Sequence, residues 1–314
     1  MSSLTYKPDS LIYSQALTSR LPRISVVIPT FARLRRLREC LLSFVAMRYP
    51  RDLFEIIVVD DGSPEPVAPA VADLESVLSL RCLRQPQSGP ASARNLGLSN
   101  TSGELVAFTD DDCRPRPGWL SSIAAGYLNN PESAMAGPVR NAVHTSVAAE
   151  TSQILVDYLL EYFDPTQSGR GFFTSNNLAF PAKQLQSMGG FSSSFPLAAG
   201  EDREICARWR DHGYESSFLP DAIVDHYHNL TISSFARQHF NYGRGAWHYN
   251  RVRSDQTGET LKVEPVRFYA KMLASAFQKA PLPRSLQVCS LLALSQALTA
   301  VGYVRERYRA GSDR

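Results

Sequence analysis

The chain has 314 residues, of which 44% are hydrophobic and 20% charged. This composition predicts a globular protein with a substantial core and excludes a largely disordered chain. Five cysteines, an odd number without a Cys-x-x-Cys pair, favour a reducing compartment and argue against a cysteine zinc site. Residues 1–20 lack the basic-then-apolar pattern of a signal peptide, so we expect a cytoplasmic location.

Four short apolar runs alternate with segments of helical spacing in the first part of the chain. The runs predict strands at 24–28, ending at Pro29, and at 55–59, 80–84 and 104–109, and the spacing predicts helices at 33–44, 66–78 and 91–100. Such alternation predicts right-handed crossovers in an α/β fold, with a mostly parallel, Rossmann-like central sheet covered by helices on both faces. Beyond residue 130 the alternation weakens, and we expect helices at 150–163 and 201–213, with Gly213 ending the latter.

The C-terminal region has a composition of its own. From residue 230 onward, 13 basic and 5 acidic residues give a net charge of +8, although the whole chain carries only +3. Its pattern predicts helices over 232–314, broken near Pro281 and Pro283. The uncharged segment 286–304 is just long enough to cross a bilayer, but its glutamines and serines favour a helix that packs in the protein or docks on a partner or membrane surface. A solvated basic face is the alternative.

Polar residues follow three of the predicted strands. They are Pro29 and Thr30, the pair Asp60–Asp61, and the run 110–112, which consists of three aspartates. Ligands of parallel sheets bind beyond the carboxyl ends of the strands. Adjacent carboxylates repel each other unless a cation lies among them, and Mg²⁺ or Mn²⁺ is the natural partner. The alternatives are a solvated acidic turn at 110–112 and a plain strand-to-helix turn at Asp60–Asp61.

Two further clusters come from the second half. Glu201 and Asp202 open the predicted helix 201–213, where one of them can act as a general base or both can be favoured by the helix dipole. His226 and His228 follow a predicted strand at 222–224, and residues two apart on a strand point to the same side, so one of them can bind a metal. A P-loop and a Gly-x-Gly-x-x-Gly fingerprint are both missing from the sequence, which argues against a P-loop nucleotidase and a dinucleotide enzyme.

Eight segments together resemble the family 2 glycosyltransferases of GT-A fold, over about residues 24–228. They are SVVIPTFAR (25–33), IIVVDDGS (56–63), GPASARNLGL (89–98), LVAFTDDD (105–112), TSNNLAF (174–180), GGF (189–191), GEDREICARW (200–209) and PDAIVDHYH (220–228). The resemblance implies an inverting, metal-dependent transferase that uses Mn²⁺ or Mg²⁺. Its expected donor is a nucleotide-sugar, UDP-linked in the first instance, and its expected acceptor is a hydroxyl of a glycan or lipid-linked molecule in cell-surface polysaccharide synthesis.

The resemblance also implies a role for individual residues. Those expected to bind the nucleotide-sugar are Pro29, Thr30, Arg33, Asp60, Asp61, Arg94, Asp110 and Asp111. The expected catalytic residues are Asp202, as the base, and Glu201. The expected metal ligands are Asp112, Asp110, His226 and His228, and the expected acceptor-side residues are Asn176, Asn177 and Trp209. The Gln-x-x-Arg-Trp motif of processive synthases is missing, and Ala32 stands where the family commonly has Asn.

The expected organisation has three parts. An N-terminal extension covers 1–22, a GT-A domain covers 23–229 with a nucleotide-binding half (23–130) and an acceptor half (131–229), and a helical region covers 230–314. The basic charge of that region predicts peripheral contact with an anionic membrane, at the inner face of the cell membrane, and no nucleic-acid partner is expected. The rival interpretations are a nucleotidyltransferase, disfavoured by the glycine-free loop PTFARLRR, and a non-catalytic relative, disfavoured by the intact aspartates.

Overall fold

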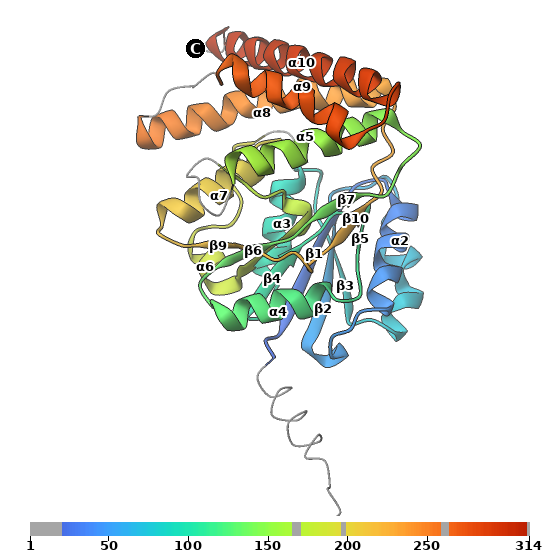
Figure 1. Cartoon of the computed structure of the whole chain (residues 1–314). Helices are drawn as coiled ribbons and strands as arrows, with labels where there is room; N and C mark the ends of the chain where they lie inside the picture. The colour runs from blue at the N-terminus through green and yellow to red at the C-terminus, as the bar shows by residue number, and fades with distance from the viewer. Residues whose placement is uncertain (1–20, 165–170, 196–198, 259–263, 313–314) are drawn as a thin grey trace, which may run out of the picture.

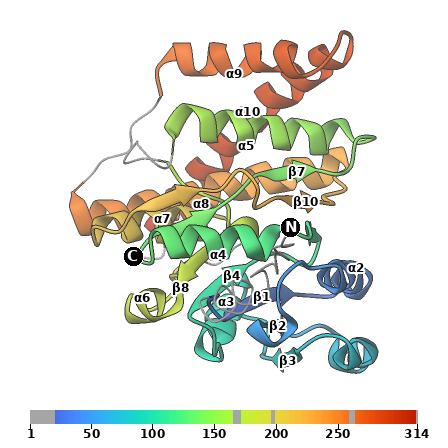
Figure 2. The same ribbon diagram turned by 60° about the horizontal axis from the view of Figure 1, so that its bottom comes forward.

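The computed structural model combines an α/β unit with a stack of helices over one end of it (Figure 1). The described residues are 21–164, 171–195, 199–258 and 264–312. The predicted N-terminal extension 1–22 therefore lies almost wholly outside the described residues. The last helices lie together on the far side of α5 from the sheet, and Figure 2 shows the same arrangement from below.

The main sheet has the strand order β3-β2-β1-β4-β8-β6-β9. Its strands are β1 (Ile24–Thr30), β2 (Phe54–Asp60), β3 (Leu80–Arg84), β4 (Leu105–Phe108), β6 (Ala134–Ala136), β8 (Leu178–Pro181) and β9 (Ser216–Phe218). The first four strands are parallel, as the alternation predicted, whereas β8 runs antiparallel to both β4 and β6. A smaller sheet joins β5 (Cys113–Pro115), β10 (Val224–His226) and β7 (Val139–Asn141).

Helices cover both faces of the main sheet, as the sequence predicted. The α-helices among the described residues are α2 (Leu34–Val45), α3 (Pro90–Ser99), α4 (Trp119–Asn129), α5 (Val147–Phe163), α6 (Ala182–Ser187), α7 (Glu201–Asp211), α8 (Ile232–Thr257), α9 (Val266–Lys279) and α10 (Arg284–Ser312), of which the last three form the stack over one end of the α/β unit. Alternate residues of β1 enter two different cores: Val26 packs with α2 and α4, and Val27 packs with α3 and α7. A strand buried on both faces reads as a continuous apolar run, which is why residues 24–28 are all but free of polar side chains.

Two predicted boundaries differ from the structure. The predicted helix 66–78 is instead a pair of short 3-10 helices, Ala68–Ala70 and Ala72–Ser76, in a segment interrupted by prolines that cannot donate a helical hydrogen bond. The first strand does not stop at Pro29 but runs to Thr30. Pairing of β1 with β4 ends at Val27, and the odd-numbered residues of β1 face β4, so the missing N–H of Pro29 falls where no partner strand remains.

Three glycines hold the C-terminal helices close to the α/β unit. A Cβ added to Gly243 of α8 would lie 1.9 Å from the carbonyl oxygen of Thr299 in α10, and one added to Gly302 would lie 2.0 Å from that of Phe240. A Cβ on Gly245 would lie 2.2 Å from the carbonyl oxygen of Ala199, just before α7. Since no larger residue fits these contacts, α8 is clamped between α10 and the turn that begins α7.

The turn between β1 and α2 holds Ala32 in a left-handed backbone conformation. Ala32 has a φ of 54°, and its N–H donates to Ser63 Oγ at 2.9 Å. The left-handed region costs an ordinary residue about 1–2 kcal/mol, and asparagine tolerates it better than alanine.

We therefore expect Ala32→Asn to raise the free energy of unfolding by about 0.5–1 kcal/mol, because the side chain is exposed and the backbone strain falls. Urea unfolding monitored by circular dichroism measures this change. Ala46→Asn, at an exposed position with φ −90°, is the matched control and should give no gain. A loss of stability in Ala32→Asn would contradict the strain argument.

Candidate active site

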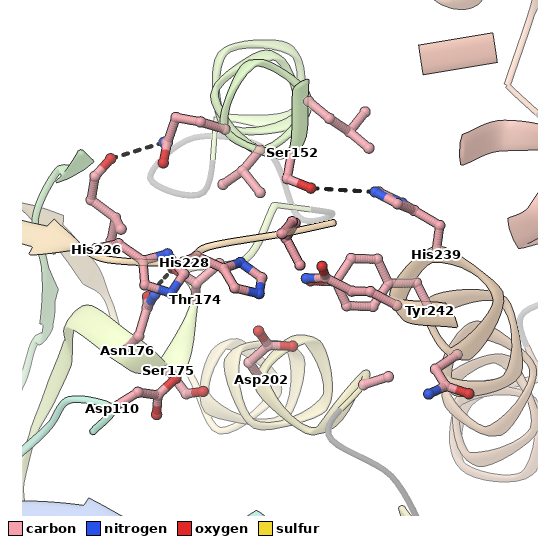
Figure 3. Close-up of a pocket in the computed structure, with 18 of the residues that line it drawn as sticks. Asp110, Ser152, Thr174, Ser175, Asn176, Asp202, His226, His228, His239 and Tyr242 are labelled. Atoms are coloured by element: carbon pink, nitrogen blue, oxygen red, sulfur yellow. Dashed lines mark hydrogen bonds between the residues drawn. The ribbon is translucent and has the colours of Figure 1, made fainter. Parts of the chain in front are cut away.

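The site is a cavity of about 650 Å³ that opens where β4, β10 and α7 end or begin. Figure 3 shows its contents: Asp202 rises from below, His226 and His228 lie on one side, Tyr242 and His239 lie on the other, and Ser152 covers the top. The predicted site residues that line it are Arg33, Arg94, Asp110, Asp112, Asn176, Glu201, Asp202, His226 and His228. The structure thus brings together residues from both halves of the α/β unit.

Asp112 is the most heavily partnered carboxylate of the site. Its Oδ1 lies 3.3 Å from Nε2 of His226, and its Oδ2 lies 3.3 Å from Arg33 Nη1 and 3.1 Å from Arg36 Nη1. His226 reaches it because β10 pairs with β5 in a register that sets His226 opposite Cys113. Burial would raise the pKa of Asp112, but the hydrogen bond and charge of His226, with Arg33, hold that pKa well below its usual range.

The neighbouring aspartates point in other directions. Asp111 turns inward, where it accepts hydrogen bonds from Thr30 Oγ1 at 2.7 Å and Arg33 Nη1 at 3.2 Å. Burial raises the pKa of Asp111 to about 6 despite the charge of Arg33. Asp110 points to the cavity and pairs with Arg94 at 2.9 Å. Only the first and third carboxylates of the run therefore face the cavity, which is the reason for a D-x-D spacing.

Arg94 connects the two acidic motifs of the cavity. Its Nη2 pairs with Asp110 and its Nη1 lies 3.2 Å from Glu201 Oε1, and both Arg94 and Glu201 are buried. Burial, followed by the charge of Asp202, raises the pKa of Glu201 to about 7. One guanidinium therefore holds both carboxylates, and Glu201, the more distant of the two, lies 107 positions after Arg94 in the chain.

Asp202 occupies the first turn of α7 and faces the cavity. Gly200, with a φ of 95°, precedes the helix, and the Asp202 carboxylate accepts a hydrogen bond from the N–H of Arg203 at 2.8 Å. Burial raises the pKa of Asp202. A carboxylate with a raised pKa and a free face towards a cavity has the properties of a general base.

A divalent cation fits the chemistry of Asp112 and His226. Carboxylate oxygen and neutral imidazole nitrogen suit Mn²⁺, and carboxylate oxygen suits Mg²⁺. Cys113 lies within 4.8 Å of both groups, but burial raises the pKa of its thiol well above the usual value, so it stays protonated in the core. The ring of His228 stacks on that of His226 at 4.8 Å between centroids, and burial, then the charge of His226, lowers the pKa of His228 to about 4.

Asp60 and Asp61, which were expected to bind the nucleotide, do not line the cavity, and each accepts hydrogen bonds that fix a turn. Asp60 accepts a hydrogen bond from the N–H of Ser63 at 2.8 Å and pairs with Arg84. Asp61 accepts hydrogen bonds from the N–H groups of Ser88 and Gly89, at 2.8 and 2.9 Å, directly before α3. Pro29 and Thr30 also lie off the cavity, at the end of β1.

Two residues expected on the acceptor side lie in the core, away from the cavity lining. Trp209 is fully buried, and its indole N–H donates to Glu215 O at 2.7 Å. The Asn177 side chain accepts a hydrogen bond from Trp119 Nε1 and donates one to the carbonyl oxygen of Ala222, both at 2.8 Å. Helix α7 turns Trp209 towards the sheet, so the tryptophan that ends the segment 200–209 packs in the core. Asn176, in contrast, does line the cavity.

Several residues at the site were not predicted from the sequence. Arg36, which pairs with Asp112, lies one helical turn after Arg33, a spacing that could have revealed it. Many of the unpredicted residues that line the cavity come from α5 and α8, and the ones used below are Ser152, Gln238 and His239. No sequence signal pointed to them, because their helices meet the site only through tertiary packing.

Comparison with known proteins assigns the family. The sequence profile of glycosyl transferase family 2 matches residues 25–185, about half of the chain. The chain therefore belongs to glycosyl transferase family 2, and it is a glycosyltransferase. Hyaluronan synthase of Pasteurella multocida is 30% identical over 225 residues, which are 60% of this chain and 23% of that protein. Glycosyltransferase AglE of Haloferax volcanii is 26% identical over 242 residues, covering 75% and 78%.

Solved structures agree with the GT-A fold. A mannosyltransferase from Pyrobaculum calidifontis, solved with GDP-Man and Mn²⁺, superposes with a TM-score of 0.65 at 19% identity and covers 96% of this chain and 94% of that one. TarS of S. aureus, residues 1–349 with UDP-GlcNAc, gives a TM-score of 0.54 at 19% identity, with 92% coverage of both chains. This likeness confirms the predicted fold class. The chain spans less than a quarter of the hyaluronan synthase that it matches.

Proposed function

We propose that this enzyme transfers a sugar, with inversion, from a nucleoside diphosphate sugar to a hydroxyl of a glycan or lipid-linked acceptor. The observation that carries the proposal is the meeting of Asp110, Asp112, His226 and Asp202 around one cavity. The complexes with GDP-Man and UDP-GlcNAc formed by proteins of the same fold support a nucleotide-sugar donor, with UDP the first to test. We also propose residues 23–229 as the transferase domain and 230–314 as a helical extension of it.

The residues divide the chemistry between them. We assign the metal to Asp112 and His226. Asp110 lies on the donor side, and His228 is a neutral neighbour of the metal site. Mn²⁺ or Mg²⁺, when bound, supplies Lewis-acid stabilisation of the departing diphosphate. Arg33 and Arg36 add positive charge beside it. Asp202 takes the proton of the acceptor hydroxyl as the oxygen attacks the anomeric carbon from the face opposite the diphosphate. One displacement of this kind inverts the configuration.

Calorimetric titration with UDP and GDP, with and without Mn²⁺, tests the donor assignment. We expect binding that strengthens when the metal is added, and release of nucleoside diphosphate from a nucleotide-sugar in a donor screen. Release of pyrophosphate would instead identify a nucleotidyltransferase. Binding without turnover of any donor would identify a non-catalytic relative.

We further propose that the enzyme contacts anionic membranes through α10. Among the described residues, α10 is the one helix long and apolar enough to cross a bilayer. Its exposed large hydrophobic side chains recur along one outer stripe, and they are Leu286, Leu294, Val301, Val304 and Tyr308. The C-terminal end of α10 also carries three arginines, which are Arg305, Arg307 and Arg309. The opposite face is packed on α8, with Glu306 buried against Arg244, so surface contact fits this helix better than spanning.

Vesicle flotation at low salt tests this contact. Wild type should float with phosphatidylglycerol-rich vesicles and less with phosphatidylcholine alone, because both charge and apolar area contribute. The double variant Val301→Ser and Val304→Ser should bind about tenfold less, since two exposed valines lose their apolar contact. Val77→Ser, an exposed valine far from α10 in sequence, is the matched control. Equal flotation of all three proteins, or none at low salt, would contradict the proposal.

A further inference from the structure

The cavity continues well beyond the reacting groups, into a chamber between three helices. Its far wall is formed by α5 and α8 with two residues of α10, and the side chains that the argument uses are Ser152, Gln238, His239, Gln296 and Thr299. Helix α8 stands where it does because Gly245 rests on Ala199 and Gly243 on α10. The chamber is therefore a built feature of the C-terminal helices, and Asp202 lies at its floor (Figure 3).

Two polar atoms of this wall are buried without a hydrogen-bond partner among the described residues. They are Nδ1 of His239 and Oε1 of Gln238, consecutive residues of α8 that both line the chamber. His239 is only 1% exposed, and its other nitrogen, Nε2, lies 3.4 Å from Ser152 Oγ. The amide nitrogen of Gln238 already donates to the hydroxyl of Tyr242. Leaving a buried polar atom unpaired costs about 1–3 kcal/mol, so such a pair indicates a ligand that supplies the missing partners.

The chamber wall carries almost no charge. Of the described lining residues on α5, α8 and α10, Arg237 alone has a permanent charge, and it is exposed. Burial lowers the pKa of His239 to about 4, so its ring is neutral at pH 7. The rest of the wall mixes neutral polar groups with apolar ones such as Leu155 and Val156. Among the described residues of this wall, a negatively charged group would find only the exposed Arg237 to offset its lost hydration and a positively charged group would find no carboxylate, whereas hydroxyls can both donate and accept.

We propose that this chamber binds the acceptor as an uncharged sugar residue, whose hydroxyls pair with Gln238 Oε1 and His239 Nδ1 while another hydroxyl reaches Asp202. This assignment deepens the proposed function and rests on it, because it names the acceptor class of the same site. A sugar ring presents hydroxyls at its edge and C–H groups on its faces, which matches a wall of alternating amide and aliphatic side chains. Gln238 and His239 are thus specificity-determining residues, and Figure 3 shows His239 on the opposite side of the cavity from His226.

Saturation-transfer NMR with neutral methyl glycosides tests the proposal. The probes are methyl β-glucoside and methyl β-galactoside, with methyl glucuronide and glucose 6-phosphate as charged comparators, in the presence of UDP and Mg²⁺. We expect the neutral glycosides to bind wild type and the charged ones to bind more weakly. Gln238→Ala and His239→Phe should each weaken the neutral glycosides roughly 3- to 10-fold, because each removes one hydrogen bond from a buried site.

Gln256→Ala is the matched control, because it makes the same change at an exposed position of the same helix. It should leave glycoside affinity unchanged. UDP affinity, measured by calorimetry, should stay the same in all four proteins, which shows that each variant is folded and separates the chamber from the donor site.

Two results would overturn the inference. One is stronger binding of the charged glycosides than of the neutral ones; the other is neutral glycoside affinity in both chamber variants equal to that of Gln256→Ala. Failure of the proposed function looks different, because wild type would then bind neither UDP nor GDP, whatever the glycosides do.

Discussion

Replacing Asp202 by asparagine should lower turnover about 10²- to 10⁴-fold while nucleoside diphosphate affinity stays within twofold of wild type. Asparagine fills the same space and still accepts the hydrogen bond from the N–H of Arg203, but it cannot take a proton. A loss of that size corresponds to about 3–5 kcal/mol of transition-state stabilisation. Steady-state release of nucleoside diphosphate in the presence of acceptor measures the first quantity, and calorimetry measures the second.

Glu201→Gln is the matched control for this substitution. Glu201 faces Arg94, to which glutamine can still present an acceptor oxygen, so we expect a loss of no more than about tenfold. An equal loss in both variants would show that the base is not Asp202 alone, and near-normal turnover in Asp202→Asn would refute the assignment.

The assignment of Asp202 as the base also predicts how kcat/KM of the wild type depends on pH. Burial raises the pKa of Asp202, and it raises that of Glu201 to about 7. A base acts only when ionised, so kcat/KM should fall as the pH drops, with a midpoint above the usual carboxyl range. A midpoint near pH 4 would contradict the raised values.

Replacing Asp112 by asparagine should abolish the metal-dependent part of nucleotide binding. Loss of a charged ligand should weaken Mn²⁺ binding by about 10²-fold or more. The metal-free affinity for UDP should not fall, because Arg33 and Arg36 lose the carboxylate that they now neutralise and keep their attraction for phosphate. Calorimetric titration of UDP with and without Mn²⁺ separates the two quantities.

Asp111→Asn provides the control, since the carboxylate next in sequence points at Thr30 and away from the cavity. It should keep the increase in UDP affinity on addition of metal, even if the protein becomes less stable. An unchanged metal response in Asp112→Asn, or its loss in Asp111→Asn, would remove Asp112 from the metal site.

The donor-facing part of the fold was accessible from the sequence because local patterns determine it. Apolar runs that end in Asp60 and Asp110 predicted parallel strands whose carboxyl ends share one edge, and the structure has those strands. The position of α7 also followed from local signals, since the helix ends at Asp211, two residues before Gly213 with its φ of 82°. The antiparallel β8 did not, because four apolar residues carry no information on strand direction.

The remaining part of the site depends on packing between distant segments. His239 reads as an ordinary residue of an amphipathic helix, and only the docking of α8 on Ala199 carries it to the cavity. Trp209, expected on the acceptor side, lies in the core, since an aromatic side chain in a motif can serve the core as readily as a ligand. Neither outcome follows from spacing along the chain, because both are decided by which face of a helix meets the rest of the molecule.

Part of the chamber wall comes from helices outside the stretch that carries the family profile, and that has a practical consequence. Residues 25–185 carry the family profile and the D-x-D aspartates, whereas α8 and α10 supply the opposite wall from outside that stretch. Gln296 and Thr299 belong to the final helix, so shortening the protein there would open the chamber to water. If the chamber binds the acceptor as we propose, we expect changes confined to these helices to exchange the recipient molecule while leaving the activated-sugar chemistry intact, and a fusion partner is better attached elsewhere.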